Sequence, residues 1–443
     1  MITGLINKLT KLAKKNKRAA KKKHQHALPL IVPRSEHTIS RRDISECALK
    51  VLYRLHKHGY EAYLVGGAVR DLLLGLKPKD FDVATNAKPE EVRALFRNCR
   101  LIGRRFRLAH VYFGDEIIEV ATFRAKHLES ELTQSHTSAG MIVNDNVYGT
   151  MEDDAWRRDF TVNALYYNIA DFSIVDYTGG LIDLNAKQLS LIGEPEQRFR
   201  EDPVRILRVI RFASKLKLKI DPTLLQPISQ YAHLITSVSS ARLFEEVRKL
   251  FHSGEGAVAF NFMQQFKLFE ALFPFTQGCE SEAFPLNAFL NAVFTSTDKR
   301  IQADKSVTPV FLFAAIFWYP LCLRAQALVD EGLPTWVARE KMMEPLFQAQ
   351  LKTIGVPRRL LHAVRELLML QMRMERPPSK KANRIVNEPR FRAAYDFIAL
   401  RVEVGEPLDR AVSEWKRFYE SEEVIPSRPP RKRRYKQRKP KTS

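Results

Sequence analysis

The chain has 443 residues, enough for two or three domains, and its 45% hydrophobic content suffices for packed cores. Its net charge of +22 lies at the ends: residues 1–30 and 427–443 each hold nine Lys or Arg and no acid, which leaves 54 basic against 50 acidic residues elsewhere. The composition excludes a collagen-like or wholly disordered chain. Two polycationic ends on a nearly neutral body indicate a polyanionic partner, either a nucleic acid or an anionic membrane surface.

The cysteines and the longest apolar stretch indicate a reduced, cytosolic protein. Cys47, Cys99, Cys279 and Cys322 lie far apart, without CxxC pairs or zinc spacings, so buried thiols are expected. Residues 310–323 are apolar but fall short of the roughly 20 residues that span a bilayer, and they contain a proline. We therefore expect a core helix there. The N-terminus lacks the continuous apolar segment of a signal peptide.

Helices and strands alternate in the first third of the chain. A helix is expected to begin at Ser40, with Asp43 as its capping partner, and to end at Gly59. Short β-rich and helical patterns follow to about residue 125. Strands are expected at residues 60–65, 80–84, 107–113 and 117–124, and helices at residues 69–74 and 89–97.

The remainder of the chain is predominantly helical in pattern. Residues 126–150 are polar and turn-rich, so we expect a mobile loop. A mixed segment continues to about residue 193. From Pro203 to about residue 420 the apolar residues recur at helical spacing. An α/β segment followed by a large α-helical region is therefore expected.

The first candidate site is the pair Asp80 and Asp82. In a strand, the two-residue period places both carboxylates on one face. Two such carboxylates have the geometry to bind a pair of Mg²⁺ ions about 4 Å apart. Taken alone, two aspartates at this spacing are more often a solvated surface pair, so the neighbouring residues are needed to distinguish the two interpretations.

Gly66 and Gly67 stand between a predicted strand and a predicted helix. There, bare backbone N–H groups can approach phosphate oxygens. Arg70 follows one helical turn later and can reach the same anion. Because Asp80 lies thirteen residues beyond Gly67, phosphate binding is favoured over an ordinary turn.

A third carboxylate would complete a metal site, and the sequence offers two candidates. Glu119 would lie beside Asp80 and Asp82 if the strand at residues 117–124 were adjacent to theirs. Asp159 is the rival. Glu119 as an ordinary strand-face acid, and Asp159 as a partner of Arg158, remain open alternatives.

Base selection is expected at the helix that follows residue 201. Asp202 sits at the predicted helix start, where it also caps, and Arg205 and Arg208 follow on one face. An acceptor and a donor one turn apart can select a base edge without a template. A capped helix with solvated arginines is the alternative.

Four ordered segments together resemble the class II nucleotidyltransferases of the polymerase-β superfamily, which comprise bacterial poly(A) polymerases and CCA-adding enzymes. The resemblance covers roughly residues 60–250. The matching segments are LVGGAVRDLLLGLKPKDFDV (64–83), RRDFTVNALYYN (157–168), EDPVRILRVIRFA (201–213) and ARLFEEV (241–247).

The resemblance implies roles for individual residues. It makes Asp80 and Asp82 metal-binding catalytic carboxylates and gives Asp159 a further active-site position. Glu119 stays the candidate third metal ligand on the strand pattern alone. It places Arg158 and Asn163 at the nucleotide and makes Asp202 and Arg205 readers of the base. With the patterns above, the expected nucleotide-binding residues are Gly66, Gly67, Arg70, Arg158, Asn163, Asp202, Arg205 and Arg208.

The implied fold is α+β: an N-terminal nucleotidyltransferase head with a small mixed sheet, followed by an all-α neck, body and leg. The basic ends have few apolar side chains to pack, so they are expected to be disordered. The expected divisions are a basic arm at 1–39, the head at 40–180, the neck at 181–255, the body and leg at 256–420, and a basic tail at 421–443.

One segment distinguishes between the two activities of the class. LIGRRFRLAH (101–110), with Arg104, Arg105, Phe106 and His110, resembles the signature of bacterial poly(A) polymerases. The chain has no His-Asp dipeptide, so the phosphohydrolase domain fused to some CCA-adding enzymes is missing. The expected activity is template-independent transfer of AMP from ATP to RNA 3′ ends, with pyrophosphate release by two-metal catalysis, promoting RNA decay.

The expected cofactors are two Mg²⁺ ions, with Mn²⁺ as an alternative, and the substrates are ATP and RNA 3′ ends. A monomer in the bacterial cytoplasm is expected. The basic ends, and an amphipathic pattern within residues 5–13, leave attachment to the inner membrane or to an RNA-decay protein open. A CCA-adding tRNA nucleotidyltransferase and a non-catalytic RNA-binding protein are the alternatives; intact Asp80 and Asp82 argue against the latter.

Overall fold

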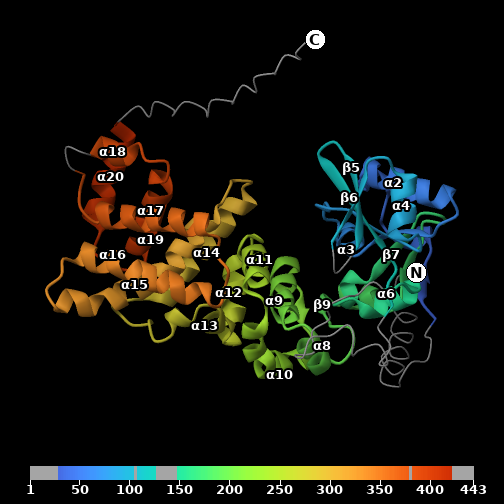
Figure 1. Cartoon of the computed structure of the whole chain (residues 1–443), viewed down its shortest axis with the longest axis horizontal. Coiled ribbons are helices and arrows are strands. Elements are labelled where there is room, and N and C mark those ends of the chain that lie inside the picture. Colours follow the sequence, from blue (N-terminus) through green and yellow to red (C-terminus); the bar gives the residue numbers. More distant parts are fainter. Residues whose placement is uncertain (1–27, 104–106, 126–146, 379–381, 422–443) are drawn as a thin grey trace, which may run out of the picture. The chain divides into compact units, whose positions relative to one another are not determined.

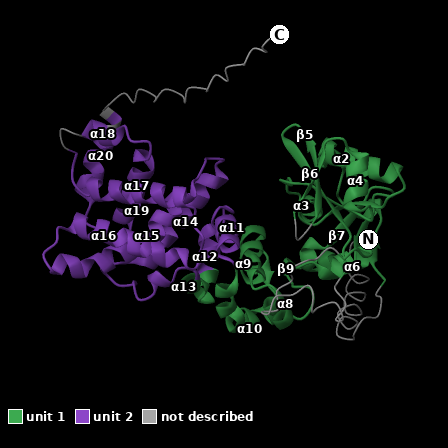
Figure 2. Ribbon diagram, in the orientation of Figure 1, with its two compact units in different colours: residues 1–238, 262–271 green, residues 239–261, 272–443 purple. Residues whose placement is uncertain are grey.

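The computed structural model describes residues 28–103, 107–125, 147–378 and 382–421 (Figure 1). It divides into two compact units, residues 1–238 with 262–271 and residues 239–261 with 272–443 (Figure 2). The expected disordered ends, the expected loop at 126–150 as far as residue 146, and the Arg104–Phe106 core of the signature lie outside the described residues. The expected limits of arm, head, neck, body, leg and tail stay a prediction.

An eight-stranded mixed sheet organises the first unit, which confirms the α+β class. Its order is β1-β8-β7-β2-β3-β6-β5-β4, in which β3 and β6 run parallel and the other neighbours antiparallel. The strands are β1 (Leu30–Val32), β2 (Ala62–Val65), β3 (Asp82–Thr85), β4 (Cys99–Ile102), β5 (Leu108–Phe113), β6 (Glu116–Thr122), β7 (Leu165–Asn168) and β8 (Ile174–Asp176).

Strand β1 lies within the segment expected to be a basic arm. Leu30 pairs with Asp176 and Val32 with Ile174, so the sheet begins ten residues before the expected head. The apolar run 30–32, bounded by Pro29 and Pro33, is too short to stand out as a strand in the sequence. It forms because β8 offers an edge to pair with.

Helices α2 (Glu46–Lys57) and α4 (Pro89–Leu95) pack together against one face of the sheet (Figure 1). The expected start of α2 at Ser40 was wrong. Ser45 caps this helix by accepting hydrogen bonds from the N–H groups of Cys47 and Ala48, whereas Ser40 caps a short 3₁₀ turn. Both serines precede an acid and an apolar run, so the cap pattern alone does not separate them.

Helix α6 (Met151–Arg157) covers part of the opposite face. Ala155 of this helix is buried in a cluster with Val65, Ala84 and Tyr166 of the sheet. At β3, β6 and β5 the same face carries accessible polar side chains, and Asp82 and Glu119 are exposed there. The sheet therefore presents an accessible polar region beside a packed one.

The other elements of the first unit lie between residues 34 and 237. Apolar residues of α9 at positions 206, 209, 210 and 213 are buried, as their spacing predicted. The elements are η1 (Arg34–Glu36), η2 (Arg41–Asp43), α3 (Gly67–Leu73), η4 (Thr161–Asn163), α7 (Gly180–Asn185), β9 (Gln188–Leu189), α8 (Pro195–Glu201), α9 (Val204–Leu216), β10 (Lys219–Ile220), α10 (Pro222–Tyr231) and η5 (Ala232–Ser237).

The second unit is helical around α15 (Pro309–Asp330), which packs against α14, α16 and α17. Helix α15 is long and apolar enough to cross a membrane, but 67% of its most apolar stretch is buried inside the protein, as expected of a core helix. The elements from residue 240 onward are α11 (Ser240–Phe251), α12 (Gly256–Gln265), α13 (Leu268–Leu272), η6 (Pro274–Thr276), α14 (Leu286–Gln302), α15, α16 (Thr335–Leu351), α17 (Arg358–Met374), α18 (Ala382–Val386), α19 (Phe391–Glu403) and α20 (Asp409–Ser421).

Candidate active site

Asp82 lies at a junction of three strands. It is the first residue of β3, and its register partners are Val65 at the end of β2 and Glu119 in β6. Paired residues on adjacent strands direct their side chains to the same face of the sheet. The strands of Asp82 and Glu119 are thus adjacent, which is the condition on which the choice of Glu119 depended.

Asp80 is not part of the strand. The expectation that Asp80 and Asp82 alternate along one strand was wrong, since β3 begins at Asp82. The pairing stops there because β2 ends at Val65 and Gly66 turns away with φ +72°. Asp80 therefore lies in the loop before β3, where the alternation of side chains along a strand does not fix its direction.

Glu119 and Asp80 both act electrostatically on the carboxylate of Asp82. The Asp82 side chain is accessible to water, but the protein around it removes part of its hydration, and this desolvation is the first cause that raises the pKa of Asp82 to about 6. The negative charges of Glu119 and Asp80 add to the shift, while Arg158 opposes it. A carboxylate whose ionisation is disfavoured by other carboxylates gains from a nearby cation. Acidic oxygens gathered in this way form an electrostatic environment suited to divalent metal.

Gly66 and Gly67 connect β2 to α3 beside these acids. The N–H of Gly66 donates to the carbonyl oxygen of Leu165 at 3.1 Å. At Gly66, φ is +72° and ψ −127°, a conformation that glycine alone adopts readily, and an added Cβ would lie 3.4 Å from Nη1 of Arg158. Because Gly66 follows the partner of Asp82, the glycine turn and the carboxylates meet at one end of the strands.

Arg70 is 3% exposed and is held by protein partners. It donates to Oδ1 of Asn163, and its Nε and Nη2 lie 2.9 and 2.7 Å from Oδ1 of Asp71. Its guanidinium also lies 5.4 Å from the ring centre of Phe212. In this structure Arg70 pairs with the carboxylate of Asp71 and joins α3 to the turn that contains Asn163.

Asp159 directs its carboxylate to Arg208, whose Nε and Nη2 lie 2.7 and 2.5 Å from Oδ2. Oδ1 accepts from the N–H of Phe160 at 2.8 Å and lies 3.4 Å from Nδ2 of Asn163. Burial would raise the pKa of Asp159, but Arg208 and these hydrogen bonds hold it below its ordinary value. The carboxylate of Asp159 is thus engaged by Arg208, Phe160 and Asn163, whereas Glu119 is the register partner of Asp82.

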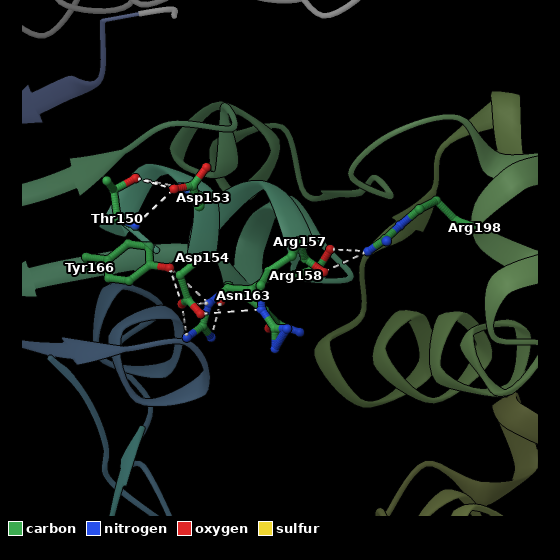
Figure 3. Close-up of polar contacts among 8 residues, drawn as sticks. All are labelled: Thr150, Asp153, Asp154, Arg157, Arg158, Asn163, Tyr166 and Arg198. Carbon is green, nitrogen blue, oxygen red and sulfur yellow. Dashed lines mark hydrogen bonds and ion pairs between the residues drawn. The ribbon is translucent and has the colours of Figure 1, made fainter. Parts of the chain in front are cut away.

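Arg158 is fixed by two residues that the sequence patterns did not single out (Figure 3). Its Nη2 lies 2.9 Å from Oδ2 of Asp154, its Nε donates to the hydroxyl of Tyr166 at 3.0 Å, and that hydroxyl donates to Asp154 at 2.7 Å. Burial would raise the pKa of Asp154, but Arg158 and Arg157 hold it below its ordinary value. An acid four residues before an arginine on a helix was the available signal.

Arg198 links α8 to the end of α6, as Figure 3 shows. Its Nη2 donates to the carbonyl oxygens of Arg157 at 2.9 Å and Arg158 at 2.6 Å. Its Nη1 and that of Arg205 lie 2.8 and 3.1 Å from Oε2 of Glu201. Arg198 satisfies carbonyls at the end of a helix, so it couples the position of α8 to that of Arg158.

Asp202 lies between α8 and α9. The expectation that Asp202 caps α9 was wrong, because Pro203 is the N-cap residue of that helix and makes no side-chain capping bond. Oδ1 of Asp202 accepts from the N–H of Val204 at 3.3 Å, in the turn between the two helices. The side chain of Arg205 donates to the carbonyl oxygen of Arg198 and to Glu201. The structure thus brings Asp202 and Arg205 within one turn, with Arg205 anchored on the α8 side.

The described residues contain no compact group of three or more His, Cys, Asp or Glu side chains ready to hold a metal ion. The available donors nevertheless fit one. Asp82 and Glu119 are register partners, Asp80 acts on Asp82, and all three provide the hard oxygen ligands that Mg²⁺ and Mn²⁺ prefer.

Comparisons with known proteins agree with this site. Three families match: the Poly A polymerase head domain over residues 62–190, the "Probable RNA and SrmB- binding site of polymerase A" over 217–279, and the Polymerase A arginine-rich C-terminus over 331–443. Poly(A) polymerase I of Escherichia coli O6:H1 is 48% identical over 429 residues, which are 94% of this chain and 92% of that protein. The chain belongs to the poly(A) polymerase I family. The Haemophilus influenzae member is 44% identical over 86% of both chains.

CCA-adding enzymes are more distant relatives of this poly(A) polymerase family member. That of Bacillus velezensis is 34% identical over 253 residues, 57% of this chain and 61% of that protein. A Bacillus stearothermophilus CCA-adding enzyme solved with CTP matches with a TM-score of 0.61 and 26% identity, over 86% of this chain and 83% of that one. The chain is therefore an enzyme of the nucleotidyltransferase class, which uses nucleotide and RNA substrates and divalent metal.

Proposed function

We propose that this chain transfers AMP from ATP to the 3′-hydroxyl of RNA without a template, releases pyrophosphate, and thereby promotes RNA decay. The observation that carries this proposal is the 48% identity to poly(A) polymerase I over 94% of the chain. The CCA-adding enzyme of Bacillus velezensis matches only 57% of the length of this chain. CCA addition is accordingly the second candidate.

In this proposal Asp80, Asp82 and Glu119 hold two Mg²⁺ ions, with Mn²⁺ as a substitute. When bound, such ions supply Lewis acidity for an attacking hydroxyl and charge neutralisation for a leaving triphosphate. Asp82 and Glu119 contribute from adjacent strands, and Asp80 from the loop. The rigid register of β3 with β6 supports this assignment because it fixes two of the ligands in advance of substrate.

The nucleotide would lie against the glycine turn. The bare backbones of Gly66 and Gly67 would approach the triphosphate, and Arg158, clamped by Asp154 and Tyr166, would present its charge to it. Arg70, Asn163, Asp159 and Arg208 would hold the surrounding elements in place through the contacts described above. Asp202 and Arg205 would read the base.

We further propose a monomer in the bacterial cytoplasm. Attachment to the inner membrane or to an RNA-decay protein would involve the polycationic ends, since residues 1–30 and 427–443 carry eighteen of the 72 basic residues and no acid. Flotation with anionic and neutral vesicles, with and without residues 427–443, tests the membrane alternative.

Labelled ATP or CTP, offered with generic RNA and with tRNA trimmed of its CCA end, tests the proposed function. The proposal expects long A tails on generic RNA and little incorporation of C. Addition of a single C, C and A to trimmed tRNA would replace it with the second candidate. Absence of incorporation from either nucleotide would refute both.

A further inference from the structure

A row of polar side chains continues across the sheet from Asp82. Register pairing places Asp82 beside Glu119, Glu119 beside His110 of β5, and His110 beside Arg100 of β4. Adjacent strands lie about 4.8 Å apart, and paired residues share one face of the sheet. His110 is therefore the neighbour of Glu119 on the side away from Asp82.

His110 lies beside the carboxylate of Glu119, within ion-pairing distance but beyond hydrogen-bonding distance. Its Nε2 lies 3.6 Å from Oε1 of Glu119, and the two side chains are 18% and 49% exposed. The ring of Tyr112, the next residue of β5 on the same face, lies 6.4 Å from that of His110, and the guanidinium of Arg100 lies 5.6 Å from the ring of Tyr112. The imidazole is thus confined by its neighbours, whereas the longer Glu119 side chain extends toward solvent.

We propose that His110 is a positioning residue for Glu119. With metal bound, its Nε2–H would close on Oε1 as a hydrogen-bond donor and turn Oε2 toward Asp82, where the proposed metal site lies. The inference rests on the proposed function, because it requires Glu119 to be a metal ligand. His110, the last residue of the segment 101–110, thereby gains a physical role. It lies on β5 and not in the loop that contains Asp80.

The expected loss of metal affinity follows from the restraint that His110 places on the Glu119 side chain. A glutamate side chain has three rotatable bonds, so an unrestrained Glu119 samples orientations in which it does not bind metal. Groups that orient a metal ligand through a hydrogen bond typically contribute 10- to 100-fold in metal affinity. Loss of the His110 donor should therefore weaken metal binding by that factor.

Four variants separate this role from ordinary packing. His110→Leu removes the donor, and His110→Gln keeps an N–H donor at the position of Nε2. His110→Asn keeps a polar side chain whose amide is too short to reach Glu119, which guards against a folding defect in the leucine variant. Tyr112→Phe is the matched control, because it deletes a polar group from the same strand face without removing the ring.

The experiment measures binding of Mn²⁺ alone to each full-length variant by electron paramagnetic resonance, beside a thermal unfolding curve. We expect 10- to 100-fold weaker Mn²⁺ binding in His110→Leu and His110→Asn, and binding within a few-fold of wild type in His110→Gln and Tyr112→Phe. AMP incorporation by the two weakened variants should recover at high Mg²⁺.

Two results would overturn the inference: wild-type Mn²⁺ binding in folded His110→Asn, or equally weak binding in His110→Gln. A Glu119→Gln variant with unchanged Mn²⁺ binding would also overturn it, because Glu119 would then not be a ligand. Failure of the proposed function is distinguishable, since it would appear as absent AMP incorporation in the wild-type protein.

Discussion

Substitution of the two neighbouring glycines at the start of α3 should have opposite consequences. Gly66 adopts φ +72° and ψ −127°, and its added Cβ would lie 3.4 Å from Arg158 and 3.5 Å from the carbonyl oxygen of Asn163. A residue with a side chain in such a conformation costs about 1–3 kcal/mol. Gly67 is the first residue of α3, and its Cβ would meet Nη2 of Arg70 at 3.5 Å, an ordinary contact.

We therefore expect Gly66→Ala to destabilise the protein by about 1–3 kcal/mol. With a urea dependence of about 3 kcal/mol per molar, this corresponds to a midpoint lowered by about 0.3–1 M. Gly67→Ala should leave the midpoint unchanged or slightly raised, because alanine favours helix over glycine.

Catalysis should respond differently to the second variant. If the backbone of Gly67 approaches the triphosphate, a Cβ there raises KM for ATP while stability is retained. Urea unfolding followed by circular dichroism, together with initial rates of AMP incorporation against ATP concentration, measures both effects. A Gly66→Ala protein as stable as wild type would refute the conformational reasoning, and an unchanged KM in Gly67→Ala would refute the phosphate contact.

Three further outcomes are expected. Glu119→Gln should shift AMP incorporation to higher Mg²⁺, whereas Asp159→Asn should disturb the use of ATP instead. Because Arg208 holds the pKa of Asp159 below its ordinary value, Asp159→Asn should also remove stability that wild type has above about pH 4 and loses as the pH falls further. Mg²⁺ titrations and acid unfolding curves of both variants measure these effects, and coincident curves for the two variants would contradict them. Arg205→Ala should reduce the preference for ATP over CTP by roughly ten- to a hundred-fold, since a bidentate base contact is worth about 1–3 kcal/mol; an unchanged preference with a lower rate would place base selection elsewhere. Deletion of residues 427–443, which hold nine basic residues, should reduce the slope of log RNA affinity against log salt by about three if half of them meet phosphates of single-stranded RNA; turnover at saturating RNA should persist, and an equal slope would assign the tail to another partner.

The sequence predicted the site where local pattern and long-range pairing agree. Asp82 and Glu119 both fall in strands that were expected from β-rich composition. The structure adds that these two strands, β3 and β6, pair with each other. The α9 core residues likewise follow from helical spacing. These features depend on periodicity, which a single sequence displays.

Other features depend on contacts between distant segments. Asp80 leaves the strand because its neighbour β2 ends at Val65, and β1 exists because β8 offers an unpaired edge. Arg70 has the spacing of an anion ligand, yet its guanidinium pairs with the neighbouring Asp71 and also donates to Asn163, ninety-three residues away. Tertiary packing determines which groups these residues contact. The sequence pattern therefore indicates which residues are candidates for a site, but not the groups that they contact.

Single-turnover AMP incorporation by Asp82→Ala tests the central claim most directly. Asp82 stands at the junction of β2, β3 and β6, next to Glu119, and the account makes it a metal-binding catalytic carboxylate. Removal of a metal ligand should lower the rate by orders of magnitude, while RNA affinity should stay within a few-fold of wild type, because the account assigns Asp82 to the metal and not to the RNA. A near wild-type rate in folded Asp82→Ala protein would contradict the account.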